Sequence, residues 1–565
     1  MSVVQMGDNQ QSGSPAGSSQ ASGSTRPVQD SAVGKISLCL SGGGFRAVGF
    51  HLGAVEYLDH VGLLGNVNRI STVSGGTFVG ATWIVSLLED KRFDDYFREY
   101  FTFNETADLM SLAFANLRAG RPGTPSGRNS LIVSMAEVHA NTIMRSPEGG
   151  SYRFETILDA DLPLDEIVFN TTELRNGLAF AFRKSTDPDA IIGNPELRIS
   201  REDAADARMA DIVTASSCFP GGFESLAFPD DFVWRDKEPP TELRHQFSSD
   251  GKPHPVGFVD GCVYDNQGIE TLLIDGAMHG EDTDMAIISD TDQRFNEIYP
   301  IPAATEYHNQ LRLGQVLRIM QFVAVLVVLG TAAIGTHLYL AYTNHTLRIS
   351  DAVLYAIPLI FGGVISFGLL WGYFTVRRVA SASIPAVGRS IWKGLKGARM
   401  YDLLEMVGLR MTLLMAINEK FNPKRIRELV YEVVYNMPVY KGKLVSNRIF
   451  ELAPGEPWAH ELPAGIAQPS RELHRVADVA AKLGTNLWFD HPYELPCLVA
   501  AGQATLCYNL MIWVVRRHGA EPSQYKKDVR KLWDRLNSDW TALCANPYAL
   551  LEERLPDRSF ERPPR

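Results

Sequence analysis

Short apolar runs alternate with glycine-rich turns in the first part of the chain. Residues 36–40 are apolar apart from one serine and predict a buried strand. Three glycines follow at 42–44, and apolar positions then recur at helical spacing through residues 47–58. A second strand is predicted at residues 68–73, and it leads through a Ser-Gly-Gly turn into an apolar segment that extends to residue 88. This repetition of strand, glycine turn and helix predicts an α/β fold with a parallel sheet.

Two long apolar segments occur in the second half of the chain. Residues 319–342 and 352–376 contain no Asp, Glu, Lys or Arg, and each is longer than the ~20 residues that a helix needs to cross a bilayer. They predict a transmembrane hairpin. Basic residues lie on both outer flanks, so the positive-inside rule places both flanks in the cytoplasm. Gly368 and Gly372 have the spacing of helix contacts, either within the hairpin or between the chains of a homo-oligomer.

The remaining segments complete a predicted domain organisation. Residues 1–34 are rich in Gly, Ser and Gln and predict a disordered tail. An α/β domain is expected over residues 35–310 and the hairpin over 311–380. A mostly helical remainder of the same domain is expected over 381–520, including an amphipathic helix at 401–420, and a helical tail over 521–565.

Charge and cysteine usage exclude some classes of function. The chain has 54 Lys and Arg against 65 Asp and Glu, a net charge of −11, so it lacks the basic surface of a nucleic-acid-binding protein. Its six scattered cysteines form no C-x-x-C pair and suit a reducing compartment. Acidic pairs lack the spacing of a calcium loop and are interpreted as solvated loop residues, so no metal is predicted; the pairs are Asp282/Asp284 and Asp290/Asp292.

Ser74 is the first candidate for chemistry. It lies between a predicted strand and a predicted helix, as in a nucleophile elbow, where a sharp turn exposes the hydroxyl. The helix that follows directs its positive end at the site. The usual G-x-S-x-G pattern is incomplete, because Thr72 replaces its first glycine while Gly76 is present. A loop serine without a catalytic role is the alternative.

The glycine loop at residues 42–44 is the second candidate. Its backbone N–H groups can converge on one anion and form an oxyanion hole. A dinucleotide-binding loop is the competing interpretation, and it requires an acidic residue about 20 positions further on. The nearest acidic residues, Glu56 and Asp59, fall within the predicted helix, which disfavours that interpretation.

Asp260 is the third candidate. An apolar run ends at Asp260-Gly261, which places a carboxylate at a strand end where it can accept a serine proton. A second Asp-Gly pair, Asp275-Gly276, lies nearby and is the alternative base.

Together, these three motifs resemble those of the patatin-like phospholipase family, including its cytosolic phospholipase relatives. The family's GGGxR loop is similar to residues 42–46, and its serine motif matches at Ser74 and Gly76. Its DG-A/G motif is similar at Asp260-Gly261, with Cys262 in place of the usual small residue. The sequence that follows favours Asp260, whereas Asp275-Gly276-Ala277 fits the short motif more literally. The resemblance covers about residues 35–292, including 170–177 and 215–223, and resumes near 484–509.

The resemblance implies a three-layer α/β domain with a largely parallel central sheet and a Ser-Asp dyad. Ser74 would attack an acyl carbonyl and Asp260 would take its proton. The backbone N–H groups of Gly43, Gly44 and Phe45 would hold the oxyanion, with Gly42 shaping the loop. Arg46 would either stabilise that loop or pair with a lipid phosphate. Neither a metal nor another cofactor is needed.

The expected protein is therefore a membrane-anchored lipid acyl hydrolase of the phospholipase A or lysophospholipase type. It would act on phospholipid or lysophospholipid of the cytoplasmic leaflet, with its catalytic domain and both termini in the cytoplasm. Two alternatives stay open. The same serine could pass the acyl group to another lipid, or the chain could be a catalytically silent membrane scaffold.

Overall fold

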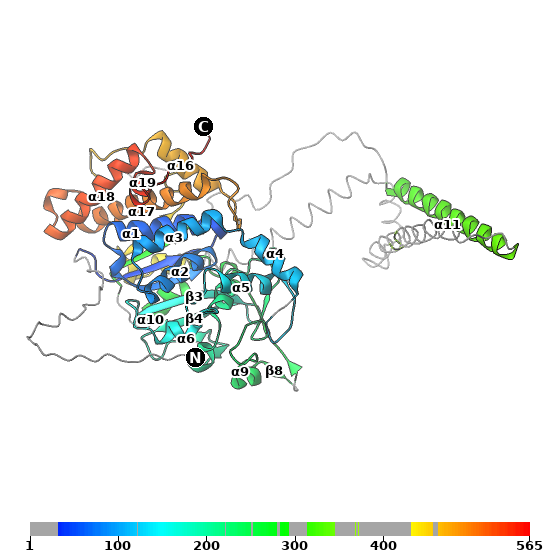
Figure 1. Ribbon diagram of the computed structural model, residues 1–565. Helices are drawn as coiled ribbons and strands as arrows, with labels where there is room; N and C mark the ends of the chain where they lie inside the picture. The colour runs from blue at the N-terminus through cyan, green and yellow to red at the C-terminus, as the bar shows by residue number, and fades with distance from the viewer. Residues whose placement is uncertain are drawn as a thin grey trace, which may run out of the picture. The chain divides into compact units, whose positions relative to one another are not determined.

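The computed structural model describes most of the chain and divides it into two units (Figure 1). The first unit is formed by Met1–Asn296 and Pro423–Arg565, and the second by Glu297–Asn422. The predicted tail up to residue 31, the predicted helix at 401–420 and nearly all of the second apolar segment lie outside the described residues. The described residues are 32–120, 123–220, 222–249, 252–278, 283–292, 313–344, 368, 371, 431–455 and 462–564.

A ten-stranded sheet forms the centre of the first unit. Its main path runs β12-β11-β1-β2-β3-β4-β5-β6, and β10 pairs with both β3 and β7. The strands of this sheet are β1 (Ile36–Leu40), β2 (Val67–Val73), β3 (Glu166–Glu173), β4 (Leu178–Ser185), β5 (Ile192–Gly193), β6 (Arg198–Ile199), β7 (Leu226–Phe228), β10 (Val256–Asp260), β11 (Met285–Asp290) and β12 (Leu444–Arg448). A separate two-stranded ribbon pairs β8 (Ser248–Ser249) with β9 (Lys252–Pro253).

The sheet is mixed in direction. The five neighbouring strands from β12 to β3 are parallel, which confirms the α/β prediction and its first two strands. The remaining pairs are antiparallel, a feature that the sequence did not predict. The reversal begins after β3, where a short turn containing Gly177 at φ 70° leads straight into β4. A parallel continuation would instead need a crossover connection of about a dozen residues or more.

Two strands meet end to end along the same edge of β3. The parallel strand β2 ends at Val73, which pairs with Asn170. The antiparallel strand β10 ends at Asp260, which pairs with the next residue of β3, Thr171. The carboxyl ends of β2 and β10 therefore face each other, and the residues at these two ends come together.

Helices cover the sheet, and the longest buried one comes from the end of the chain. In Figure 1, α17 lies beside α1, and glycines allow the two backbones to approach closely. A Cβ on Gly53 would lie 2.1 Å from Val499 O, and one on Gly502 would lie 2.1 Å from Phe50 O. The helices of this unit are α1 (Gly44–His60), α2 (Gly75–Leu88), α3 (Phe93–Thr106), α4 (Leu109–Ala119), α5 (Leu131–Asn141), α6 (Phe154–Asp159), α7 (Arg201–Ala205), α8 (Met209–Ser216), α9 (Thr241–Gln246), α10 (Asp275–Met278), α16 (Arg471–Lys482), α17 (Glu494–His518), α18 (Lys527–Ala545) and α19 (Ala549–Arg554).

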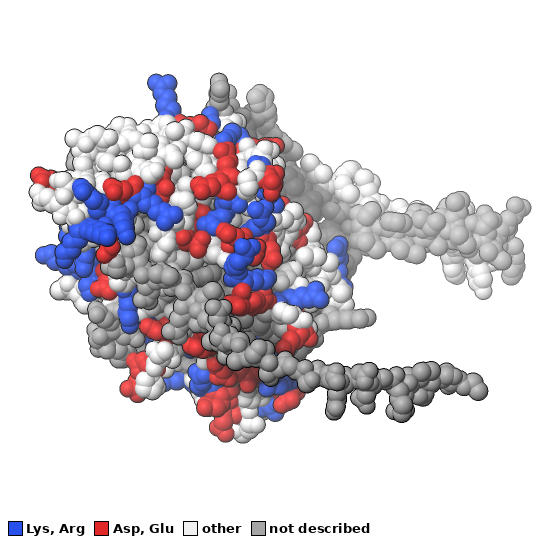
Figure 2. All heavy atoms as spheres, turned by 60° about the vertical axis from the view of Figure 1, so that its left-hand side comes forward, with Lys and Arg blue, Asp and Glu red and all other residues white. Residues whose placement is uncertain are grey.

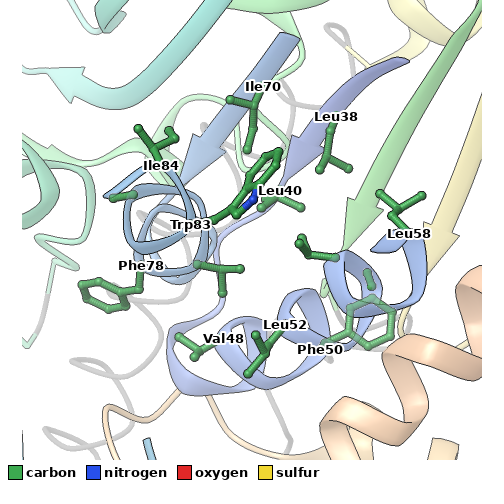
Figure 3. Close-up of a cluster of buried hydrophobic side chains, with 14 of the residues drawn as sticks. Leu38, Leu40, Val48, Phe50, Leu52, Leu58, Ile70, Phe78, Trp83 and Ile84 are labelled. Carbon is green, nitrogen blue, oxygen red and sulfur yellow. The ribbon is translucent and has the colours of Figure 1, made fainter. Parts of the chain in front are cut away.

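The core fixes the positions of the first two strands and helices. Figure 3 shows side chains of β1 and β2 facing those of α1 and α2, with the Trp83 indole close to Leu40. Leu38, Leu40 and Ile70 are completely buried. Burial of such side chains is the main stabilising contribution, at ~25 cal/mol per Å² of apolar surface. The turns that leave β1 and β2 are thereby attached to a rigid base.

Charged side chains of both signs are interspersed on the face of the first unit that Figure 2 shows. Acidic and basic groups lie next to each other in the described part of this face rather than in separate areas. That distribution agrees with the mildly acidic composition of the chain.

The described part of the second unit is mainly one helix, α11 (Leu313–Thr343). Its section Gln321–Thr343 is apolar and long enough to cross a membrane, and no described side chain in its most apolar stretch is buried. Exposed apolar side chains include Phe322, Leu329 and Tyr342. The first span of the predicted hairpin is thus a helix, whereas the hairpin itself is not established, because most of its second span lies outside the described residues.

Helix α17 also has the length and composition of a membrane span. The sequence pattern assigns it to the helical remainder of the domain, and the structure shows that it is a core helix, because 94% of its most apolar stretch is buried. It packs against α1, α16 and α18 inside the first unit. A helix that is apolar on all sides is found either in a protein core or in a membrane, and its packing in the structure shows which of the two applies.

Candidate active site

Ser74 occupies a strained turn between β2 and α2. Its backbone has φ 50° and ψ −117°, an uncommon conformation for a residue with a side chain. Small neighbours make the turn possible, since a Cβ on Gly76 would lie 2.4 Å from Leu40 O. Ser74 therefore has the backbone conformation expected of a nucleophile elbow, although Thr72 replaces the usual first glycine.

Asp260 lies directly opposite Ser74. The Ser74 hydroxyl donates to Asp260 Oδ2 at 2.6 Å, and the Cys262 amide donates to Oδ1 at 2.8 Å. The Asp260 backbone is also held, because its N–H donates to Cys218 O and its carbonyl accepts from the Thr172 hydroxyl. Asp260 is 1% exposed and Ser74 is 7% exposed. The meeting of β2 and β10 thus brings a hydroxyl and a fixed carboxylate into contact.

The alternative base, Asp275, has a different partner. It begins α10, and its carboxylate accepts from Arg183 Nη2 at 2.7 Å. Arg183 in turn lies beside Glu166, at the end of β3 that is remote from Thr171. This geometry favours Asp260 over Asp275 as the partner of Ser74.

The glycine loop presents two backbone amides beside Ser74. The Gly42 amide donates to Asn266 O at 3.0 Å and the Phe45 amide to Asn486 O at 2.8 Å. For the amides of Gly43 and Gly44, the described part of the chain holds no hydrogen-bond acceptor. The expectation that Phe45 donates to an oxyanion is therefore corrected, because its amide serves to attach a distant loop.

Gly75 adds a third amide that the sequence analysis did not consider. It is the first residue of α2, and a Cβ there would lie 2.2 Å from Gly44 O. The N-termini of α1 and α2 are consequently in contact, and their dipoles both favour negative charge at Ser74. The rule that a nucleophile elbow uses the amide after its serine could have identified this residue.

A comparison with models of protein families finds one family to which part of this chain is similar. Residues 38–273 match the model of the patatin-like phospholipase family. We call this matched segment the patatin-like domain. Proteins of this family are generally serine hydrolases that act on lipids. The matched range includes Ser74, Asp260 and the glycine loop, and it ends before β11 and β12.

Two further comparisons concern whole chains. None of the curated proteins matches this chain. Among solved structures, it is similar to human GIVD cytosolic phospholipase A2, with 15% sequence identity and a TM-score of 0.28. That match covers 46% of this chain and 43% of the phospholipase chain.

Arg46 of the patatin-like domain supports the loop that follows α16. Its guanidinium is buried, and Nη1 donates to Leu483 O at 2.8 Å. Burial lowers the pKa of Arg46, while Asp292 and Asp290 oppose this shift. The Phe45 and Phe489 rings are 5.3 Å apart and strengthen the same attachment. Of the two roles considered for Arg46, this geometry favours loop support.

A hydroxyl network behind Ser74 explains the departure at Thr72. The Ser74 amide donates to Ser216 Oγ at 3.1 Å, and Ser216 Oγ lies 2.8 Å from Thr77 Oγ1. Thr77 donates to Thr72 Oγ1 at 3.0 Å, and Thr72 donates to Val168 O. The hydroxyl of Thr72 thus links β2 to α2. The segment 215–223 resembles the family, but no local sequence signal assigns this position to Ser216.

A small apolar pocket in the first unit is lined in part by residues that are close in sequence to Ser74 and Ser216. Phe78 lies one helical turn after Ser74. Ser217 directly follows Ser216, whose hydroxyl accepts from the Ser74 amide. His139 closes one wall, with its Nδ1 2.8 Å from Thr214 Oγ1, and burial lowers its pKa to about 3. The pocket is lined by Phe78, Leu109, Ile132, Met135, His139, Ser217, Phe223 and Leu487.

Asp290 and Asp292 differ from the solvated residues that the sequence suggested. Asp290 ends β11, is 5% exposed and accepts from Gln267 Nε2 at 2.7 Å. Burial and Asp292 raise the pKa of Asp290 to about 6. Asp292 accepts from Asn266 Nδ2 at 2.9 Å. Among the described residues there is no group of three or more His, Cys, Asp or Glu side chains that could hold a metal ion.

Proposed function

We propose that this protein hydrolyses fatty-acyl esters of phospholipids or lysophospholipids through an acyl-serine intermediate. The observation that carries the proposal is the 2.6 Å hydrogen bond from the strained Ser74 to the buried Asp260, inside a patatin-like domain. Ser74 is the nucleophile and Asp260 the general base. Because a carboxylate is a weak base for a serine hydroxyl, stabilisation of the developing oxyanion must supply much of the rate.

In the first step, Ser74 Oγ attacks the ester carbonyl carbon and its proton moves to Asp260. The amides of Gly43, Gly44 and Gly75 donate to the oxyanion, and one such donor contributes ~3 kcal/mol. The tetrahedral intermediate collapses, the alcohol portion of the lipid leaves with the proton from Asp260, and the acyl group remains on Ser74. Water then attacks the acyl-enzyme, Asp260 takes its proton, and the fatty acid leaves as the proton returns to Ser74.

The pocket lined by Phe78 and Leu487 supports an apolar substrate. Hydrocarbon is the group that such side chains bind without leaving polar atoms unpaired. The pocket is too small for a whole acyl chain, so we assign to it only the carbons next to the ester carbonyl, because Phe78 is only four residues from Ser74.

Membrane anchoring through α11 is the second part of the proposal. A helix whose Leu, Val and Phe side chains are exposed is unfavourable in water and stable in a bilayer. We propose that α11 and the second apolar segment hold the patatin-like domain at the cytoplasmic leaflet. Contacts through Gly368 and Gly372 would allow a homo-oligomer.

Product analysis by mass spectrometry tests the reaction. The purified full chain is incubated with mixed phospholipid and lysophospholipid vesicles in water enriched in ¹⁸O. Ser74→Ala is the inactive variant, and Ser86→Ala, a buried serine later in α2 that bonds to Trp83 O, is the matched control. Hydrolysis predicts ¹⁸O-labelled fatty acid from the wild type and from Ser86→Ala, and none from Ser74→Ala.

Other outcomes identify the alternatives. Acyl groups transferred to acceptor lipids without ¹⁸O would show a transacylase that uses the same serine. The absence of product from all three proteins would contradict the enzyme proposal and favour the scaffold.

A further inference from the structure

Thr291 is a buried residue that contacts the glycine loop from outside the family-matched range. It follows β11 directly and is completely buried. Its hydroxyl donates to Gly42 O at 2.6 Å, and its amide donates to Ser41 Oγ at 2.9 Å. A Cβ on Gly43 would lie 2.4 Å from Thr291 Oγ1, so the loop and the threonine are in direct contact.

The bond to Gly42 O determines the orientation of the next amide. The C=O of Gly42 and the N–H of Gly43 belong to one trans peptide, in which these two groups point in opposite directions. A hydroxyl that holds the carbonyl therefore directs the Gly43 N–H away from Thr291. Without that bond, the carbonyl of Gly42 keeps only the longer hydrogen bond from Ser41 Oγ, at 3.3 Å. The peptide plane is then held more weakly, since glycines on both sides of it allow a wide range of backbone angles.

The strand order shows where this N–H points. β1 lies between β11 and β2, so the loop after β1 has Thr291 on one side and Ser74 on the other. A Cβ on Gly42 would lie 3.1 Å from Ser74 Cβ, so the loop reaches the serine. An N–H directed away from the end of β11 is thus directed toward the end of β2, where an oxyanion on the substrate would form.

The preceding peptide is held separately. His51 Nε2 donates to Ser41 O at 2.9 Å, and its Nδ1 accepts from the Ser289 hydroxyl at 3.0 Å. Burial lowers the pKa of His51 to about 4, so the ring is neutral and can both donate and accept. His51 therefore fixes the Ser41–Gly42 peptide, and the hydroxyl of Thr291 fixes the Gly42–Gly43 peptide.

We infer that Thr291 is a positioning residue for the ester hydrolysis proposed above: its hydroxyl holds Gly42 O so that the Gly43 N–H is already aimed at the oxyanion. The inference rests on the proposed function. The benefit of such preorganisation appears in the transition state, where the charge develops, and not in the binding of the neutral ester.

Isosteric substitution tests this role. Thr291→Val removes the hydroxyl and nearly preserves the volume, while Thr291→Ser keeps the hydroxyl. Thr283→Val is the matched control, because Thr283 is buried before the other end of β11 and its hydroxyl bonds to Ser37 Oγ at 2.8 Å. The proteins are compared for kcat and KM on a lipid ester. They are also compared for affinity to an acyl trifluoromethyl ketone, whose carbonyl becomes an oxyanion when Ser74 Oγ adds to it and Asp260 takes the proton.

We expect Thr291→Val to lower kcat and ketone affinity each by ~10-fold or more, with KM within about twofold. Thr291→Ser and Thr283→Val should stay within about threefold of the wild type in both measurements. If Thr291→Val does not fold, as judged by its circular dichroism and melting curve, Thr291→Ala takes its place with the same expectation.

Two results would overturn the inference. One is an unchanged kcat and ketone affinity in the hydroxyl-free variant. The other is an equal loss in Thr283→Val, which would show a general effect of removing a buried hydroxyl. Either result leaves the proposed function standing as long as the wild type releases fatty acid. A wild type that does not react with ester or ketone would contradict the proposed function itself and the inference with it.

Discussion

The hydroxyl of Ser74 donates to the carboxylate of Asp260 at 2.6 Å, across a sequence separation of 186 residues. The contact follows from two strands that end against neighbouring residues of β3, Asn170 and Thr171. Neither strand could shift by one residue without turning its side chains to the other face of the sheet. The dyad geometry is therefore a property of strand register.

Removal of either member of this pair should abolish ester hydrolysis. Ser74→Ala lacks the nucleophile, and Asp260→Asn cannot accept its proton, so we expect kcat to fall by ~10³-fold or more in each. The double variant should be no worse than the worse single variant, because the two residues act as one unit. Steady-state hydrolysis of a short-chain ester measures these effects, and melting curves check that each protein is folded. Independent, multiplying losses would contradict the dyad.

The second Asp-Gly pair gives a contrasting prediction. Asp275→Asn should keep kcat within about twofold, because Asp275 bonds to Arg183 and not to Ser74. Its cost should appear in stability, at ~1 kcal/mol for a partly exposed ion pair. Parallel assays of kcat and stability for Asp275→Asn and Asp260→Asn decide which carboxylate is the general base. A large loss of kcat in Asp275→Asn but not in Asp260→Asn would make Asp275 the base.

Substitution of Gly44 should remove activity through backbone geometry. Gly44 has φ 58°, and a Cβ there would lie 2.5 Å from Asn486 O. Gly44→Ala must displace the loop that carries the amides, so we expect kcat to fall by ~100-fold. Gly62→Ala is the control, since Gly62 has φ 77° with open space around it. It should lose only ~1 kcal/mol of stability and keep its kcat. Equal kcat values in Gly44→Ala and Gly62→Ala would show that the glycine loop does not contribute to catalysis.

Glu451 should make stability depend on pH. Its partly buried carboxyl accepts from Asn509 Nδ2, and the loss of solvation raises its pKa to about 7. The folded chain therefore holds this proton more tightly than the unfolded chain, and the resulting stability is present below the ordinary glutamate pKa and is lost as the pH rises through about 7.

Glu451→Gln isolates this effect because glutamine stays neutral. The unfolding free energy of the variant minus that of the wild type should increase between pH 4.5 and 8, by at most ~3 kcal/mol. Urea titrations of both proteins over this range measure the difference, in which the contributions of His51 and all other shared groups cancel. A difference that is constant with pH would show that Glu451 has the same pKa in the folded and the unfolded chain.

Deletion of residues 313–378 should separate anchoring from catalysis. The deleted segment belongs to the second unit, whereas Ser74, Asp260 and Thr291 belong to the first. We expect the shortened chain to move from the membrane to the soluble fraction and to keep its kcat on a water-soluble ester. Fractionation by centrifugation and an ester assay measure the two properties. A shortened chain that still pellets with vesicles would show that another surface binds the membrane.

Local sequence patterns predict the elements on which the candidate site is built. Apolar periodicity placed β1, α1, β2 and α2, because burial imposes a period of 2 or 3.6 on a strand or a helix. Glycines at 42–44 and 75–76 marked the turns, since only small residues allow such close backbone approach. The three motifs also identified Ser74, Asp260 and the loop as candidates. Local pattern sufficed because each of these features depends on neighbouring residues.

Which of these residues contact one another depends on long-range packing. Asp260 and Asp275 are equivalent as dipeptides, and the register of β10 on β3 distinguishes them. The amide of Phe45 is occupied because a loop more than 400 residues away reaches it. α17 and α11 are both long and apolar, yet one packs on α1 and the other is exposed. The contact of Thr291 with Gly42 depends on the pairing of β11 with β1. Sequence patterns report local preference, whereas these contacts depend on long-range packing, which fixes distances between segments that are far apart in the chain.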